Sequence, residues 1–192
     1  MVKISIAGGQ RVPKGFVGMD LVKLKDVKYV GDILDFGKDS VWKKIKDNSV
    51  DEYECSHFIE HIPHGNGYID PFFKFFDEVY RTLKPAKFSK DNPNIPTSGF
   101  AKFVTPYYSS MRAFQDPTHI RHITDMTLYY LDKEWRKVNG LDHYKVKCDF
   151  KFNAYYVLNA RLQNRNQEFV QNAILTQWNA VDDLAFTVWK IK

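Results

Sequence analysis

The stretch VDEYECSHFIEHIP, Val50 to Pro63, decides the fold of this chain. Its first four residues predict a buried strand, and the chain then breaks into a short polar segment at 55–61 that is rich in cysteine, serine, histidine and glutamate. Further along, EVYRTLKP, Glu78 to Pro85, indicates the end of an amphipathic helix. A strand that opens into polar residues and is followed by a helix and another strand is typical of an open α/β sheet, which builds its sites at the carboxyl ends of its strands.

Hydrophobic periodicity on either side of this stretch predicts the other elements. The expected strands are 2–6, 16–19, 27–30, 50–53, 100–104, 146–162 and 184–191. The expected helices are 40–45, 71–83, 124–135 and 167–178, and 89–98 is expected to be a loop. Strands that alternate with helices and end in two late strands favour an α/β fold with a mostly parallel seven-stranded sheet and an antiparallel C-terminal edge strand.

Bulk properties narrow the setting in which we expect the protein to work. A chain of 192 residues suits one domain, 1–192. It has no apolar run long enough to span a bilayer, its first residues lack the layout of a signal peptide, and its two cysteines are far apart. We therefore expect a reduced, cytoplasmic protein that does not bind membranes. The net charge of +5 is spread along the chain, which favours a solvated surface over a basic face for an anionic substrate.

Two more motifs lie near the start of the chain, ISIAGG at Ile4 to Gly9 and PKGFVGMD at Pro13 to Asp20. Together with SHFIEHIP and EVYRTLKP they resemble the class I S-adenosylmethionine-dependent methyltransferases, specifically the methyltransferase type 11 group. Members of that group carry similar patterns, "lnlGcG…pGwinvD" and "lEHi…E.yRvLKPGG". The resemblance covers nearly the whole chain. It implies a Rossmann-like fold, S-adenosyl-L-methionine as cofactor, and methyl transfer to an acceptor substrate.

The resemblance also implies a set of cofactor-binding residues at the ends of the first four strands. Glycine after the first strand lets the backbone approach a ligand closely, and Asp20 after the second can accept hydrogen bonds from ribose hydroxyls. Asp32 stands where the family places a residue beside the adenine, with Ile33 as an apolar wall. The full set is Ala7, Gly8, Gly9, Asp20, Asp32, Ile33, Cys55, Ser56 and His57, the last three with their backbone near the methionine part.

The sequence departs from the family pattern at three places. Ala7 replaces the first glycine, and LKPGG has become LKPAK at 83–87. The gap between Gly9 and Phe16 is too short for a full crossover helix, because parallel neighbours normally need a connection of a dozen residues or more. We therefore expect a reduced first crossover helix. The same departures motivate an alternative interpretation, a degenerate, non-catalytic cofactor-binding protein.

Two histidine-bearing segments are the candidates for chemistry. His119 follows the turn former Asp116-Pro117 on the active-site side of the predicted sheet, and histidine titrates near neutral pH. His119 and His61 are therefore the expected catalytic residues, with proton removal from the acceptor as their role. We expect no metal. The alternative is a site made by His57, Glu60 and His61, because the related ubiquinone-biosynthesis O-methyltransferases have a similar Glu-x-x-Glu-His pattern that binds a divalent metal.

The leading hypothesis is methyl transfer from S-adenosylmethionine to a small-molecule or glycan-type acceptor. The mildly basic charge makes a nucleotide or nucleic-acid methyltransferase the other enzyme alternative. The Asn/Asp-Pro-Pro-Tyr/Phe signature of amino-group DNA methylation is absent after the fourth strand, which argues against a nucleic-acid substrate. The sequence does not identify the acceptor atom or the oligomeric state.

Overall fold

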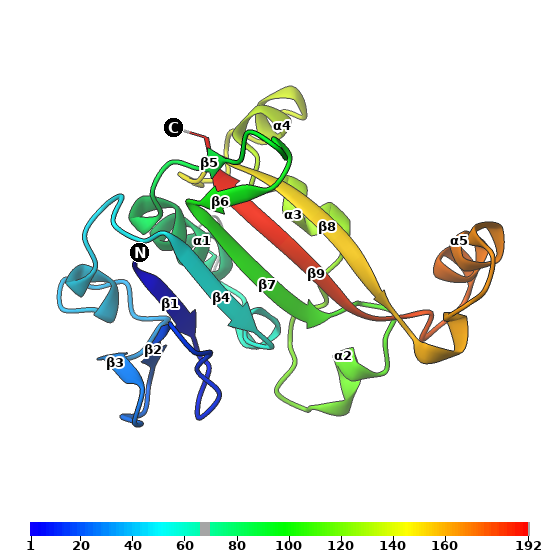
Figure 1. Cartoon of the computed structure of the whole chain (residues 1–192), viewed down its shortest axis with the longest axis horizontal. Helices are drawn as coiled ribbons and strands as arrows, with labels where there is room; N and C mark the ends of the chain where they lie inside the picture. Colours follow the sequence, from blue (N-terminus) through cyan, green and yellow to red (C-terminus); the bar gives the residue numbers. More distant parts are fainter. Residues whose placement is uncertain (66–69, 192) are drawn as a thin grey trace.

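A seven-stranded sheet forms the centre of the protein in a computed structural model, which describes residues 1–65 and 70–191 (Figure 1). The strands lie in the order β3-β2-β1-β4-β7-β9-β8. Their bounds are β1 Lys3–Ile6, β2 Val17–Asp20, β3 Val27–Val30, β4 Glu52–Ser56, β7 Phe100–Pro106, β8 Phe150–Leu158 and β9 Val181–Lys190. A separate two-stranded sheet pairs β5 (Lys87–Phe88) with β6 (Pro96–Ser98), within a region that was predicted to contain a loop at 89–98.

The predicted α/β class, the seven strands and the antiparallel C-terminal strand are confirmed. The first five strands in spatial order are parallel, and β9 runs antiparallel to both of its neighbours. One detail of the prediction is corrected, because the C-terminal strand is not at the edge. β9 lies between β7 and β8, so that β8 is the edge strand. Its central position agrees with its composition, since Leu184, Phe186 and Val188 are fully or almost fully buried.

The helices fall between these strands, and most are short. They are the 3₁₀ helices η1 Val41–Lys44, η2 Ile59–His61 and η3 Ala160–Leu162, and the α-helices α1 Pro71–Thr82, α2 Arg112–Gln115, α3 Asp125–Tyr129, α4 Lys133–Val138 and α5 Gln167–Thr176. The single helix expected at 124–135 is two helices. Thr124 caps the first in a capping box, and Asp132 begins a second by accepting from the backbone N–H groups of Glu134 and Trp135.

Helix α1 is the long helix of the fold and was predicted almost to the residue. Asp70 accepts a hydrogen bond from the N–H of Phe72 at 2.8 Å, and Pro71 occupies the first helical position. Phe75 and Phe76 on its inner face are fully buried against Phe103 of β7, with ring centroids 6.2 and 5.2 Å from that ring. Burying a side chain of this size contributes about 1.5–3 kcal/mol, so α1 is held mainly by this aromatic contact.

The helices cover only one face of the sheet. Figure 1 shows α1 and α3 behind it, with no helix across the front of β1, β4, β7 and β9 among the residues drawn in colour. On the helix-free face, Glu52 pairs with Lys3 at 2.5 Å and with Lys102 at 3.1 Å. This face has no helix because the connections between the first strands are short. Residues 7–16 and 21–26, all of which are described, contain no helix. The expected reduction of the first crossover helix is thus confirmed, and the second crossover is reduced as well. No helix among the described residues has both the length and the apolar character needed to cross a bilayer.

Candidate functional site

The loops after β1 and β2 meet at the carboxyl edge of the sheet. The Asp20 carboxylate ends β2 and accepts hydrogen bonds from the N–H groups of Gly9, at 3.1 Å, and Val22, at 3.1 Å. The N–H of Ala7 donates to the carbonyl of Met19 at 2.8 Å. The structure therefore brings Ala7, Gly9 and Asp20 together, as the sequence predicted, and Asp20 remains partly exposed toward solvent.

Backbone conformation explains the residues of the loop after β1. Ala7 has a φ of 53° and Gly9 a φ of 55°, both in the left-handed region. A Cβ on Gly8 would lie 2.6 Å from the Oγ of Ser5, so that position has no room for a side chain. The backbone at Ala7 thus keeps a conformation that glycine adopts at no cost, although alanine adopts it at about 1–2 kcal/mol.

The remaining predicted cofactor residues differ in what they present to a ligand. Asp32 is exposed and accepts from the N–H of Leu34 at 2.8 Å, whereas Ile33 is 5% exposed and its carbonyl accepts from the Trp42 indole. Cys55 is 2% exposed and belongs to the core, and burial raises the pKa of its thiol. Its side chain therefore faces the helix layer, and only its backbone is placed near the edge. Ser56, the last residue of β4, is exposed.

A cluster of polar side chains lies at the ends of β4 and β7, centred on Glu60. The Glu60 side chain is 1% exposed, and its Oε2 accepts from the hydroxyl of Thr105 at 3.0 Å. Its Oε1 lies 3.2 Å from Nδ1 of His57 and 3.9 Å from Nε2 of His119. A buried carboxylate is costly unless it is paired and hydrogen-bonded, so these neighbours are what hold Glu60 at this position.

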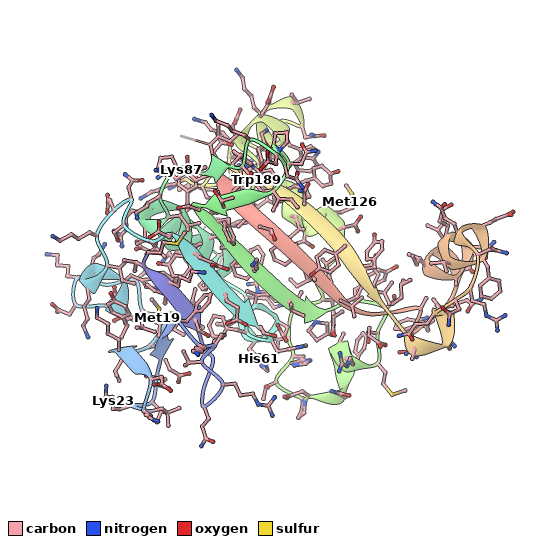
Figure 2. The ribbon with its side chains drawn as sticks, in the orientation of Figure 1. Met19, Lys23, His61, Lys87, Met126 and Trp189 are labelled. Atoms are coloured by element: carbon pink, nitrogen blue, oxygen red, sulfur yellow. The ribbon has the colours of Figure 1, made fainter. Side chains whose placement is uncertain are left out.

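His61 and His119, the two predicted catalytic residues, lie side by side in this cluster. Their ring centroids are 4.6 Å apart, at an interplanar angle of 73°. His61 is labelled in Figure 2 near the end of β4, on the opposite edge of the molecule from Lys87 and Trp189. The backbone carbonyl of Glu60 accepts from the N–H groups of Ile120 and Arg121, both at 3.0 Å. These two bonds attach the segment that carries His119 to η2, which carries Glu60 and His61.

Hydrogen bonds assign the tautomer of each ring. Nδ1 of His119 lies 3.0 Å from the carbonyl of Arg112, and a carbonyl only accepts, so this nitrogen carries the proton. The Thr118 hydroxyl donates to Asp116 at 2.7 Å and lies 2.9 Å from Nδ1 of His61, so it accepts from that nitrogen. In the neutral state both rings therefore keep a free lone pair on Nε2. Thr118 also lowers the pKa of Asp116, through its backbone N–H first and then its hydroxyl.

The cluster opens into a cavity of about 310 Å³. The lining residues are His57, His61, Pro106, Arg112, Gln115, Asp116 and His119. Arg112 pairs with Asp183 of β9, whose pKa is raised by burial and whose Oδ1 has no hydrogen-bond partner among the described residues. His57 belongs both to this cavity and to the predicted cofactor residues. It has a φ of 53°, and the hydrogen bond to Glu60 raises its pKa.

Sequence reasoning missed two members of this group, Thr105 and Asp183. Thr105 stands between apolar residues of β7, where a polar residue is ordinary strand patterning, and Asp183 follows another aspartate near the start of β9. A sharper signal was present in β9, where Asp182 and Asp183 stand side by side, so that one of them must point toward the buried side of the sheet or its edge.

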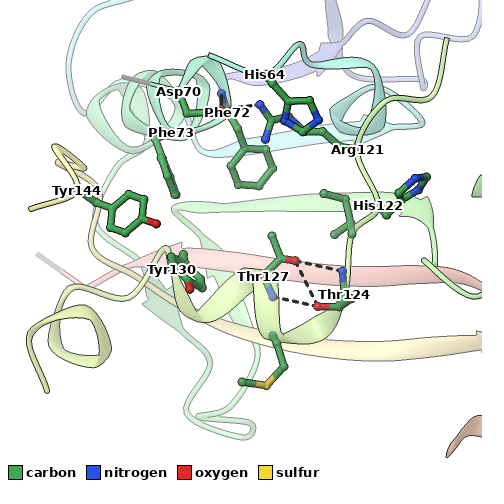
Figure 3. A pocket seen from close by; sticks show the side chains of 12 residues that line it. His64, Asp70, Phe72, Phe73, Arg121, His122, Thr124, Thr127, Tyr130 and Tyr144 are labelled. Carbon is green, nitrogen blue, oxygen red and sulfur yellow. Dashed lines mark hydrogen bonds and ion pairs between the residues drawn. The ribbon is translucent and has the colours of Figure 1, made fainter. Parts of the chain in front are cut away.

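A second cavity of about 420 Å³ lies between α1 and α3 and is drawn in Figure 3. Aromatic rings from Phe72, Phe73, Tyr130 and Tyr144 line it. Arg121 also lines it, but its guanidinium is held by Asp70 at 2.6 Å and by two backbone carbonyls. This cavity therefore offers apolar surface, whereas the acid–base groups face the cavity beside Glu60.

Solved structures with the same fold are S-adenosylmethionine-dependent methyltransferases. One, from Archaeoglobus fulgidus, is 15% identical over 98% of this chain and 85% of its own, with a TM-score of 0.55. Another, from Mesorhizobium loti, is 12% identical over 98% of this chain and 90% of its own, with a TM-score of 0.50. No protein-family profile and no curated protein matches the sequence. The chain thus has the class I methyltransferase fold.

Proposed function

We propose that this protein transfers a methyl group from S-adenosyl-L-methionine to a hydroxyl group of a small-molecule or glycan-type acceptor. The observation that carries the proposal is the position of His57. It follows β4 at the edge where the fold places its cofactor, and it lines the same cavity as His61 and His119. The two functions that methyl transfer needs, cofactor binding and acceptor positioning, are therefore neighbours in this chain.

The residues after β1 and β2 fit the cofactor that the fold implies. The Asp20 carboxylate has four lone-pair sites and uses two on Gly9 and Val22, which leaves acceptors for ribose hydroxyls. Gly8 lets the loop pass close to Ser5, because a Cβ at this position would lie 2.6 Å from the Ser5 Oγ. The bound cofactor would supply an electrophilic methyl group on a sulfonium.

The cluster beside Glu60 supports the acceptor half of the proposal. An acceptor hydroxyl must give up its proton as its oxygen forms a bond to the methyl carbon. His119 has a free Nε2 lone pair, a side chain that is 7% exposed, and a ring held by the Arg112 carbonyl. We assign His119 as the proton acceptor and His61 as its partner in positioning the hydroxyl.

Calorimetry with S-adenosylmethionine and S-adenosylhomocysteine tests the cofactor half. Binding of both in a 1:1 ratio is expected, and failure of both to bind would refute the proposal. The acceptor half is tested by following S-adenosylhomocysteine formation with panels of phenols, sugars, nucleosides and short RNA. Product with phenols or sugars is expected, and product with nucleosides or RNA alone would overturn the acceptor class but leave methyl transfer in place.

A further inference from the structure

Glu60, His61 and His119 form a group of potential metal ligands. One ligand atom from each lies within 4.8 Å of the other two, and no ion is present. Two imidazoles and a carboxylate are the donor set of several catalytic metal centres, in which the remaining positions stay open for water or substrate. We propose that these three residues bind a divalent transition-metal ion of the zinc class, with its open coordination sites directed into the 310 Å³ cavity.

The hydrogen bonds around the two rings are those that a metal centre requires. A ligating histidine must present one nitrogen without a proton, and its other nitrogen almost always donates to a carbonyl, a carboxylate or a similar oxygen. His119 donates from Nδ1 to the Arg112 carbonyl, and His61 donates from Nδ1 to the Thr118 hydroxyl. Thr118 is fixed in turn by Asp116. Both Nε2 atoms are thereby left free as donors to a metal.

The third ligand supplies the negative charge. Glu60 is buried, and the contacts that its carboxylate makes in the described structure come from Thr105, His57 and His119. No lysine or arginine contacts it among residues 1–65 and 70–191. A cation between Glu60 and the two imidazole rings would compensate the buried negative charge of Glu60. Without a cation, only hydrogen bonds and the half-exposed His57 balance that charge.

The chemistry of the donors selects the kind of metal. Mg²⁺ and Ca²⁺ prefer oxygen ligands, whereas two imidazole nitrogens favour Zn²⁺, Co²⁺, Ni²⁺ or Fe²⁺. Ligand bonds of about 2.1 Å at a tetrahedral angle place two ligand atoms about 3.4 Å apart. The three ligand atoms lie within 4.8 Å of one another, so the wider separations must close by up to about 1.4 Å as the ion binds.

Metal binding would also deepen the proposed function, on which this part of the inference rests. An acceptor hydroxyl that coordinates the ion would lose its proton to solvent through the open cavity, because a bound cation lowers the pKa of a coordinated oxygen. Its lone pair would then form the carbon–oxygen bond as the carbon–sulfur bond breaks and leaves its electron pair on sulfur. In the metal-free protein His119 is the proton acceptor; with the ion bound, His61 and His119 would be ligands, and the ion would take over activation of the hydroxyl.

The test measures metal binding by tag-free, full-length protein. The protein is stripped with a chelator and titrated with Co²⁺ while its visible absorption is recorded, and the Zn²⁺ content is measured after reconstitution and gel filtration. One ion per chain is expected for the native protein. Glu60→Gln, His61→Ala and His119→Ala should each bind at least tenfold more weakly, while His122→Ala, a histidine on the same segment outside the group, should bind as the native protein does.

Variants of Thr118 distinguish a specific metal site from adventitious metal binding. Thr118→Val should weaken metal binding about 10–100-fold, as removal of an outer hydrogen-bond partner does elsewhere, and Thr118→Ser should restore it. Circular dichroism and thermal unfolding identify variants that fail to fold. The proposal is overturned if the native protein binds no Co²⁺ or Zn²⁺, or if His119→Ala binds as tightly as His122→Ala. Calorimetry with S-adenosylhomocysteine measures cofactor binding independently of metal binding. Failure to bind metal and failure to bind cofactor can therefore be told apart.

Discussion

The carboxyl edge of the sheet has two halves that are built by different means. After β1 and β2, the groups are backbone amides and a single carboxylate, and the loops that carry them have no helix among the described residues. After β4 and β7, the groups are side chains that are held by one another, with the buried Glu60 at the centre. The first half is suited to binding a ligand by its polar edges. The second half is suited to moving a proton or holding a metal, because hydrogen bonds fix the orientation of its groups and because Glu60, Thr105 and His119 have little contact with water.

The strongest test of this division is Glu60→Gln. We expect a rate of methyl transfer at saturating S-adenosylmethionine that is lower by about 100-fold or more, because the cluster loses its only carboxylate in contact with both His57 and His119. The dissociation constant for S-adenosylhomocysteine should stay within about twofold, since the ribose contact lies in the other half. Initial rates and calorimetry measure the two quantities.

Glu54→Gln is the matched control for that variant. Glu54 lies on the same strand, β4, but its carboxylate accepts from Ser5 on the helix-free face of the sheet. Its substitution should leave both the rate and the affinity near the native values. Equal losses of rate and affinity in Glu60→Gln would contradict the division of the edge into two halves.

The two halves also differ in how far the sequence could predict them. Asp20 is the last residue of its strand and Gly9 lies in the loop after its strand, so a correct strand order was enough to place them together. The cluster depends on contacts between residues far apart in the chain, since Thr105 is 45 residues from Glu60, and Thr118 is 57 residues from His61. His119 was found because it follows a turn. Its approach to Glu60 depends on backbone bonds from Ile120 and Arg121 that no local pattern encodes.

The second prediction concerns Asp20 in the cofactor half. Asp20→Ala should raise the dissociation constant for S-adenosylhomocysteine about 10–100-fold, because hydrogen bonds to a charged group contribute about 1.5–3 kcal/mol. The rate at saturating cofactor should change by no more than a few-fold. Asp26→Ala, an exposed carboxylate between β2 and β3, is the control and should bind as the native protein does. An unchanged affinity in Asp20→Ala would remove the ribose assignment.

The third prediction concerns the opposite edge of the sheet, where a carboxylate serves stability alone. Burial by itself would raise the pKa of Asp51, but hydrogen bonds from Lys84, the Val2 N–H and Ser98 outweigh it and hold the pKa at about 2, below the usual 3.8. Because the pKa of Asp51 is lower in the folded protein than in the unfolded chain, the ionised carboxylate stabilises the fold at pH values above the unfolded pKa of 3.8. This contribution is lost as the pH falls toward the folded pKa of about 2. The contribution at neutral pH is about 2 kcal/mol.

Asp51→Asn should therefore lower the free energy of unfolding by about 2 kcal/mol at pH 7 and by less near pH 2.5. Denaturant titrations at the two pH values measure the difference, and calorimetry should give an unchanged affinity for S-adenosylhomocysteine. The same loss of stability at both pH values would show that the ionised carboxylate is not the source of the contribution.

The smallest effect is expected where a predicted cofactor residue would contribute only its backbone. Cys55 follows the family pattern for a backbone contact to the cofactor, and its side chain is 2% exposed and packs in the core. Cys55→Ala should lower the free energy of unfolding by about 1 kcal/mol, through the lost packing, and leave the affinity for S-adenosylhomocysteine within about twofold. Ser56→Ala is the matched variant, because the exposed Ser56 side chain at the end of the same strand is accessible to the cofactor. A tenfold loss of affinity in Cys55→Ala without a loss of stability would mean that the thiol itself contacts the cofactor. The cofactor half of the edge would then have to include Cys55.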